Sequence, residues 1–142
     1  IAAELASFDV YANAWLNLFA EDGVTFSEAY NTYVAEISKV DVALAGNPYA
    51  MAGWIAAAFF VEGLERVGTD VLTWDNYIDA MESAPVPNPF GGTVDYADGR
   101  RVGTQSMSLL IATIIPADGD VAESYAFNSY LPLETIDDIL AD

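Results

Sequence analysis

The feature of the sequence that most constrains its fold is an uncharged run from Tyr49 to Val61, which reads YAMAGWIAAAFFV. A helix needs about 20 apolar residues to cross a bilayer, and a run of about 10–14 is more typical of a buried helix. Charged residues at Glu62, Glu65 and Arg66 end this run early. We therefore expect a helix in the core of a globular domain and not a membrane span.

The ends of this helix are marked by residues with known positional preferences. Asn47 suits the N-cap, Pro48 suits the first helical turn and Gly68 suits the C-terminal stop. Because apolar residues lie on nearly all of its sides, we expect neighbouring elements to cover this helix on several faces.

The composition excludes several classes of function. The 142 residues include 22 acidic and 4 basic side chains, for a formal net charge of -18. Such a surface repels phosphate backbones and anionic membranes, so we expect no nucleic-acid partner. The chain has no cysteine or histidine, which removes thiolate metal sites, cysteine nucleophiles and the histidine general base. We expect no cofactor, and we attribute the charge to solubility or to a salt-adapted host.

Hydropathy patterns predict a mixture of helices and strands. Residues 8–15 alternate as a strand. Residues 24–39 are predicted to form an amphipathic helix that opens with a capping box of Thr25 and Glu28. A further helix is expected over residues 73–84, with Thr73 as its cap.

The second half of the chain is predicted to contain a hairpin. The prolines of residues 85–89 favour an extended spacer. Residues 90–96 and 100–115 are expected to be two strands joined by a turn at residues 97–99. We expect a last amphipathic helix in residues 131–142, with an apolar side formed by Leu133, Ile136, Ile139 and Leu140.

No group of side chains marks a catalytic centre. The closest carboxylate pairs are Glu62 with Glu65 and Asp137 with Asp138, but nothing places either pair in a cleft. The acidic turns in DYADGRR and PADGD do not match the spacing of a calcium-binding loop. We therefore predict no catalytic residue and no metal ligand. The scarce arginines Arg66, Arg100 and Arg101 leave two interpretations open, which are pairing with neighbouring acids and capture of a ligand carboxylate.

Several short patterns follow one another in an order that is typical of one family. The segment NPYAMAGWIAAAFFVEGLERVG has a Pro-aromatic pair that opens a long helix ending in Leu-x-Arg-x-Gly, here Leu64, Arg66 and Gly68. A short helix ending DAMESA and the run FGGTVDYADGRRVG come next. Over roughly residues 8–115 this order resembles the type 1 periplasmic binding proteins, the substrate-binding components of branched-chain amino-acid and related ABC transporters. The segment FDVYANAW is similar to the strand that crosses between the lobes of these proteins.

The resemblance implies an α/β fold class, with a partial periplasmic-binding-protein-like I fold in which helices pack on a small sheet. Residues 1–142 would be the C-terminal portion of an extracellular ligand-binding receptor, mostly elements of the first lobe, with a tail that returns to the second. Family members are more than twice this long, and the chain opens on IAAELASF without methionine. We therefore expect a piece of a longer protein.

The resemblance also implies where a ligand would bind. In the family, the residue two places after the aromatic of the Pro-aromatic pair faces the ligand, which here is Met51 after Tyr49. Trp15, at the end of the crossing strand, is a third candidate. The N-terminus of the long helix is expected to offer N–H groups and a positive dipole to a polar ligand. The alternative interpretation is that Tyr49 and Met51 are ordinary core residues.

The function implied is that of a non-enzymatic solute-binding component of an ABC importer, which holds an amino acid or similar small polar ligand between two lobes. Its partners would be the small-molecule ligand, an ABC permease in the membrane and, for a fragment with an exposed face, a second copy in a homodimer. The location implied is extracytoplasmic, periplasmic or at the cell surface, with a lipid anchor as an option. Three alternatives stay open: a ligand-sensing domain of the same fold, an acidic carboxylate-dependent hydrolase, and an oligomerising module without a ligand.

Overall fold

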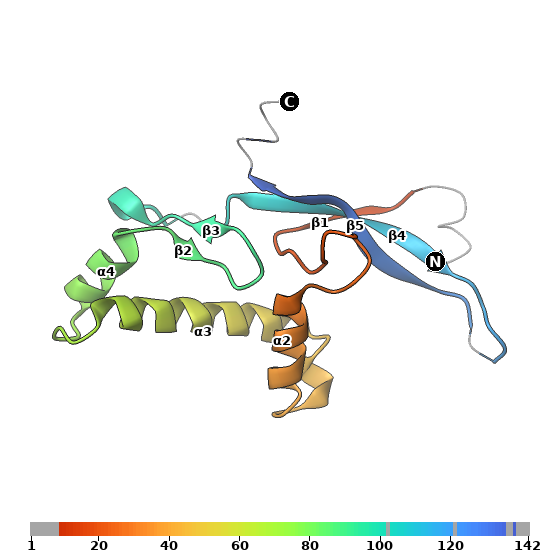
Figure 1. Cartoon of the computed structure of the whole chain (residues 1–142), viewed down its shortest axis with the longest axis horizontal. Coiled ribbons are helices and arrows are strands. Elements are labelled where there is room, and N and C mark those ends of the chain that lie inside the picture. Colours follow the sequence, from red (N-terminus) through yellow and green to blue (C-terminus); the bar gives the residue numbers. More distant parts are fainter. Residues whose placement is uncertain (1–8, 102, 121, 136–137, 139–142) are drawn as a thin grey trace. The chain divides into compact units, whose positions relative to one another are not determined.

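The computed structural model describes residues 9–101, 103–120, 122–135 and 138. The chain divides into two compact units, one comprising residues 1–27 and 107–142 and the other residues 28–106 (Figure 1). The chain therefore begins in unit 1, builds the whole of unit 2 and then returns to unit 1. Mixed helices and small sheets confirm the predicted α/β fold class.

Unit 1 is built on a three-stranded sheet in the order β1-β4-β5. Its strands are β1 (Tyr11–Ala14), β4 (Ser106–Ile115) and β5 (Ser124–Thr135). Strand β1 confirms the strand that the alternation in residues 8–15 predicts, and it runs antiparallel to β4 with Tyr11 opposite Ile111. The buried hydroxyl of Ser108 donates to the carbonyl oxygens of Ala14 at 3.1 Å and of Leu16 at 3.4 Å. These bonds hold the end of β1 against β4.

A tight turn follows the first strand in unit 1. Asp22 accepts hydrogen bonds from the backbone N–H groups of Val24 at 2.9 Å and Thr25 at 2.8 Å, and from the Thr25 hydroxyl. Phe26 then bridges back to Phe19. The predicted capping box with Thr25 is therefore wrong, because Thr25 belongs to this turn and the helix begins only at Glu28.

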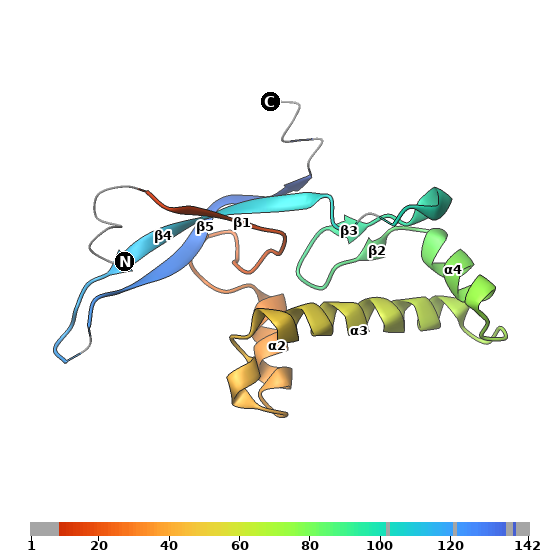
Figure 2. The same ribbon diagram turned by 180° about the vertical axis from the view of Figure 1, so that it is seen from behind.

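Unit 2 contains several helices and a small two-stranded sheet (Figure 2). Helices α2 (Glu28–Ile37), α3 (Pro48–Val67) and α4 (Trp74–Glu82) are joined by short connections, the first of which includes the 3-10 turn η1 (Val42–Leu44). Strands β2 (Val86–Pro87) and β3 (Thr93–Val94) pair antiparallel and are followed by the 3-10 turn η2 (Ala97–Gly99).

The core of unit 2 is centred on a tyrosine. The side chain of Tyr33 is fully buried, and its ring makes edge contacts with Trp54 at 5.8 Å and Phe90 at 5.9 Å between centroids. The Tyr33 hydroxyl donates to the carbonyl oxygen of Leu44 at 2.8 Å, so its polar end is satisfied. The amphipathic helix predicted within residues 24–39 therefore contributes to the core through Tyr33.

Helix α3 confirms the predicted bounds and corrects the predicted burial. Its N-cap is Asn47, its first residue is Pro48 and its C-cap is Gly68 at φ 63°. One face is buried, through Met51, Ile55, Gly63 and Val67. The opposite face, however, is exposed along Ala52, Gly53, Ala56, Ala57, Phe60 and Val61. The expectation that neighbours cover α3 on several faces is wrong for this structure, because the elements of unit 2 pack against one side of it.

Two further predictions about the second half are corrected. Residues 90–96 do not form a hairpin with residues 100–115, because β3 pairs with β2 whereas β4 pairs with β1 and β5. The amphipathic helix expected from residue 131 is wrong as far as Thr135, since β5 continues through these residues. The positions Ile136, Ile139 and Leu140 of that predicted helix lie outside the described residues. The helix predicted after Thr73 is confirmed, with the Thr73 hydroxyl accepting from the Asn76 N–H.

Candidate functional site

The first turn of α3 is the place where the sequence predicts a ligand. The side-chain oxygen of Asn47 accepts from the N–H groups of Tyr49 at 2.9 Å and Ala50 at 3.2 Å. The Met51 N–H bonds to the Asn47 carbonyl at 3.1 Å, and Pro48 has no N–H. The backbone donors expected to hold a polar ligand are therefore already used by the cap, and only the helix dipole remains available.

The three candidate ligand-binding residues differ in how much surface they offer. Tyr49 is 85% exposed at the start of α3, whereas Met51 is only 7% exposed and belongs to the core of unit 2. Trp15 is 44% exposed and follows β1 in unit 1. Tyr49 and Trp15 thus have free surface, while Met51 has little. Ligand binding by these residues stays a prediction.

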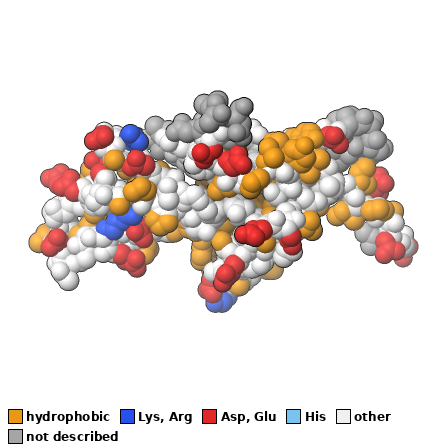
Figure 3. Space-filling model, turned by 45° about the horizontal axis from the view of Figure 1, so that its top comes forward, with side chains coloured by type: hydrophobic (Ala, Val, Ile, Leu, Met, Phe, Trp, Pro, Cys, Tyr) orange, Lys and Arg blue, Asp and Glu red, His pale blue; other side chains and the backbone are white. Residues whose placement is uncertain are grey.

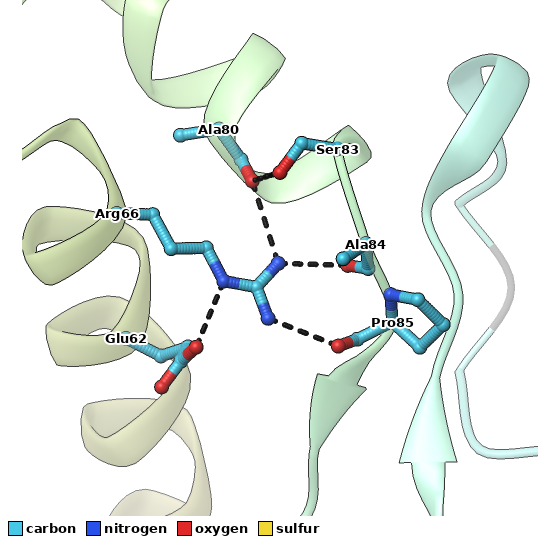
Figure 4. A network of polar contacts seen from close by, with 6 residues as sticks. All are labelled: Glu62, Arg66, Ala80, Ser83, Ala84 and Pro85. Atoms are coloured by element: carbon cyan, nitrogen blue, oxygen red, sulfur yellow. Dashed lines mark hydrogen bonds and ion pairs between the residues drawn. The ribbon is translucent and has the colours of Figure 1, made fainter.

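Arg66 ties α3 to the segment that follows α4 (Figure 4). Its Nε donates to Glu62 at 2.8 Å. Its two terminal nitrogens donate to three backbone carbonyls, those of Ala80 at 3.4 Å, Ala84 at 2.7 Å and Pro85 at 2.9 Å. The planar guanidinium presents several N–H donors at once, so it can reach all of these oxygens, whereas the compact ammonium of a lysine could not. Arg66 is therefore a structural clamp at the C-terminal end of α4.

The other basic side chains are also paired with acids. Arg100 bonds to Asp95 at 3.0 Å, Arg101 to Glu82 at 2.9 Å, and Lys39 to Glu36 at 2.6 Å. Of the two interpretations of the arginines, the structure therefore supports the first, which is pairing with neighbouring acids. Figure 3 shows the same pattern on one face, where scattered acidic side chains surround the few basic ones.

The carboxylates do not form an acid–base centre in the part of the chain that the structure describes. Glu62 is held by Arg66, and the pair of Asp137 and Asp138 lies partly outside the described residues. Hydrogen bonds from Thr25 and from the backbone of Val24 and Thr25 lower the pKa of Asp22, which is the opposite of what a general acid needs. Within the same residues no group of carboxylates is arranged to hold a metal ion.

Two hollows flank Tyr77 in unit 2. One of about 170 Å³ is lined by Tyr77, Ile78, Met81, Glu82, Tyr96 and Arg101. The other, of about 300 Å³, is lined by Phe60, Leu64, Leu72, Thr73, Trp74 and Tyr77. Burial, followed by the proximity of Tyr96, raises the pKa of Tyr77. The sequence alone does not reveal these hollows. The signal was the pair of aromatics on α4, Trp74 and Tyr77, which helical spacing alone assigns to a core.

Unit 1 has more polar hollows. One of about 350 Å³ lies beside the Asp22 turn, with Glu21, Asp22 and Tyr130 among its lining residues. Another, of about 360 Å³, borders β4 and β5 near Ser108 and Glu134. Neither contains one of the predicted ligand-binding residues.

One comparison with known proteins agrees with the patterns in the sequence. None of the described helices is both long and apolar enough to span a bilayer. The searches of curated proteins and of solved structures gave no match. The family described as periplasmic binding protein matches residues 3–119, which is most of the chain. Proteins of this family are extracytoplasmic, bind small molecules and are typically non-enzymatic. The chain therefore belongs to the periplasmic binding protein family, of type 1, and represents part of its fold.

Proposed function

We propose that this chain is the C-terminal portion of a solute-binding receptor that holds an amino acid or similar small polar ligand between two lobes and delivers it to an ABC permease. The observation that carries this proposal is the family match over residues 3–119. The course of the chain supports it, because the polypeptide leaves unit 1, builds unit 2 and returns. A chain that passes between two bodies suits hinge closure around a ligand.

Tyr49 is the residue best suited to contact the ligand. Its ring is almost fully exposed, and its backbone is fixed by the Asn47 cap, so little backbone freedom would be lost on binding. A tyrosine offers both an apolar face and a hydroxyl that can donate or accept a hydrogen bond. Trp15 would add a second aromatic surface from the crossing strand. Met51, which is buried, would support the wall behind Tyr49.

We infer binding without chemistry. The family is typically non-enzymatic. Among the described residues, the carboxyl group whose pKa is shifted is Asp22, and the shift keeps it ionised. The hydrolase alternative needs a carboxyl that stays protonated near neutral pH inside a cleft.

The test is isothermal titration calorimetry on the protein encoded by the whole reading frame that contains this chain, with a panel of L-amino acids as titrants. We expect one class of amino acid to bind, and Tyr49→Ala to weaken its affinity by about tenfold or more. The matched control is Tyr125→Ala, which removes a part-exposed tyrosine from β5 and should leave the affinity unchanged. No binding across the panel, or an equal loss in both variants, would contradict the proposal. Uptake by the reconstituted permease separates transport from sensing.

A further inference from the structure

An exposed tryptophan lies at the rim of an apolar hollow where α3 meets α4. Trp74 is 82% exposed, and it lines the hollow of about 300 Å³ together with Phe60, Leu64, Leu72 and Tyr77. Single exposed apolar side chains are ordinary, but a cluster of them around a hollow marks an interaction surface, and tryptophan is enriched among residues that dominate binding. We call Phe60, Val71, Leu72 and Trp74 the Trp74 patch.

The charge of this surface limits what can bind to it. None of the residues that line the hollow is charged, although the chain carries a net charge of -18. Exposed acids flank the Trp74 patch at Asp70 and Asp75. A partner must therefore offer an apolar surface. Acidic side chains of the partner that come close to Asp70 or Asp75 would be repelled, and salt would screen this repulsion.

The Trp74 patch combines a projection with a recess. It holds a projecting indole and, next to it, a hollow whose volume is at the lower end of those that accept small organic molecules. A two-fold interface uses the same surface on both copies, so it needs a projection and a recess on one surface. We propose that two copies of this chain associate through the Trp74 patch, with Trp74 of each copy entering the hollow of the other.

The exposed area predicts a weak dimer. Phe60, Val71, Leu72 and Trp74 are 56%, 75%, 61% and 82% exposed. Taking about 150–250 Å² for a fully exposed aromatic side chain, and the low end of that range for the smaller Val71 and Leu72, the patch offers at most roughly 500 Å² per copy. Two copies would bury roughly 1,000 Å², which is near the lower limit for a specific interface. We therefore expect association in the micromolar range or weaker, and monomers at high dilution.

Sedimentation velocity tests the proposal. From about 1 µM to about 1 mM protein, the sedimentation coefficient should rise from monomer to dimer, and the midpoint should move to lower concentration when salt is raised to about 1 M. Trp74→Glu and Leu72→Glu should each abolish the rise. Both side chains are exposed, so folding should be unaffected, which circular dichroism checks. The control is Val42→Glu, an equally exposed apolar position before the other end of α3, which should leave dimerisation unchanged.

Three results would overturn the proposal. They are a monomer at every concentration, dimers that persist in both Glu variants, and dimers lost equally in Val42→Glu. A patch covered by another part of the same receptor would give the first of these results. Ligand affinity, measured separately, should be the same in Trp74→Glu and the unmodified protein, so failure of dimerisation and failure of ligand binding are distinguishable.

Discussion

Two glycines in helix α3 allow the packing of α3 on α4 to be measured by one type of substitution. A Cβ atom added to Gly63 would lie 2.4 Å from Cε2 of Tyr77, whereas one added to Gly53 would meet nothing within 4 Å. Replacing glycine by alanine inside a helix stabilises by about 0.5–1 kcal/mol through backbone entropy. Overpacking costs about 1–3 kcal/mol. We therefore expect Gly53→Ala to stabilise, and Gly63→Ala to be less stable than Gly53→Ala by about 1–3 kcal/mol.

Urea unfolding followed by tryptophan fluorescence measures this difference. The change Trp15→Phe in all samples leaves Trp54 and Trp74 as the reporting indoles, and both lie in unit 2. The free energies of unfolding of the two alanine variants are then compared at equal m-values. Because both variants gain the same helix propensity, their difference isolates the contact between Gly63 and Tyr77.

A double-mutant cycle identifies the neighbour responsible. In a Tyr77→Ala background the crowding is removed, so Gly63→Ala should stabilise unit 2 as Gly53→Ala does. If Gly63→Ala is as stabilising as Gly53→Ala in the presence of Tyr77, then Tyr77 does not pack directly on the backbone of α3. If Gly63→Ala stays destabilising without Tyr77, another neighbour is responsible.

Three further predictions follow from the same structure. Arg66→Met should lower the free energy of urea unfolding by about 2–3 kcal/mol, because hydrogen bonds to a charged group are lost at a side chain only 18% exposed. The control is Arg100→Met, at a half-exposed side chain, which should lower it by less than about 0.5 kcal/mol. Equal losses in the two variants would contradict the role of Arg66 as a clamp. Burial, with the charge of Tyr30 second, raises the pKa of Tyr33. Its contribution to stability is present below its unfolded pKa of about 10 and is lost as pH rises through the folded value. Stability of Tyr33→Phe should thus fall less steeply above that pH, and parallel curves would argue against it. Finally, raising NaCl from about 0.1 to about 1 M should raise the melting temperature, because screening weakens repulsion within a chain of net charge -18; a lowered melting temperature would contradict this.

The local features of this protein could be predicted from its amino-acid sequence. The N-cap Asn47, the first-turn Pro48 and the stop at Gly68 fixed the bounds of α3, and Thr73 fixed the start of α4. Capping depends on hydrogen bonds within about four residues, so a short window of sequence contains the information. The family patterns are also local, and they led to the correct family and fold class.

Features that depend on residues far apart in the chain could be found only in the folded protein. Residues 131–135 have helical periodicity, but pairing with β4 makes them strand β5. The pairing of β4 with β1, the exposed outer face of α3 and the hollows beside Tyr77 likewise follow from contacts between separate segments of the chain. Strand partners and burial are set by packing against non-local neighbours, which propensity and periodicity do not contain. For the same reason the sequence could name Tyr49, Met51 and Trp15 as candidates, whereas only the structure separated two exposed side chains from a buried one.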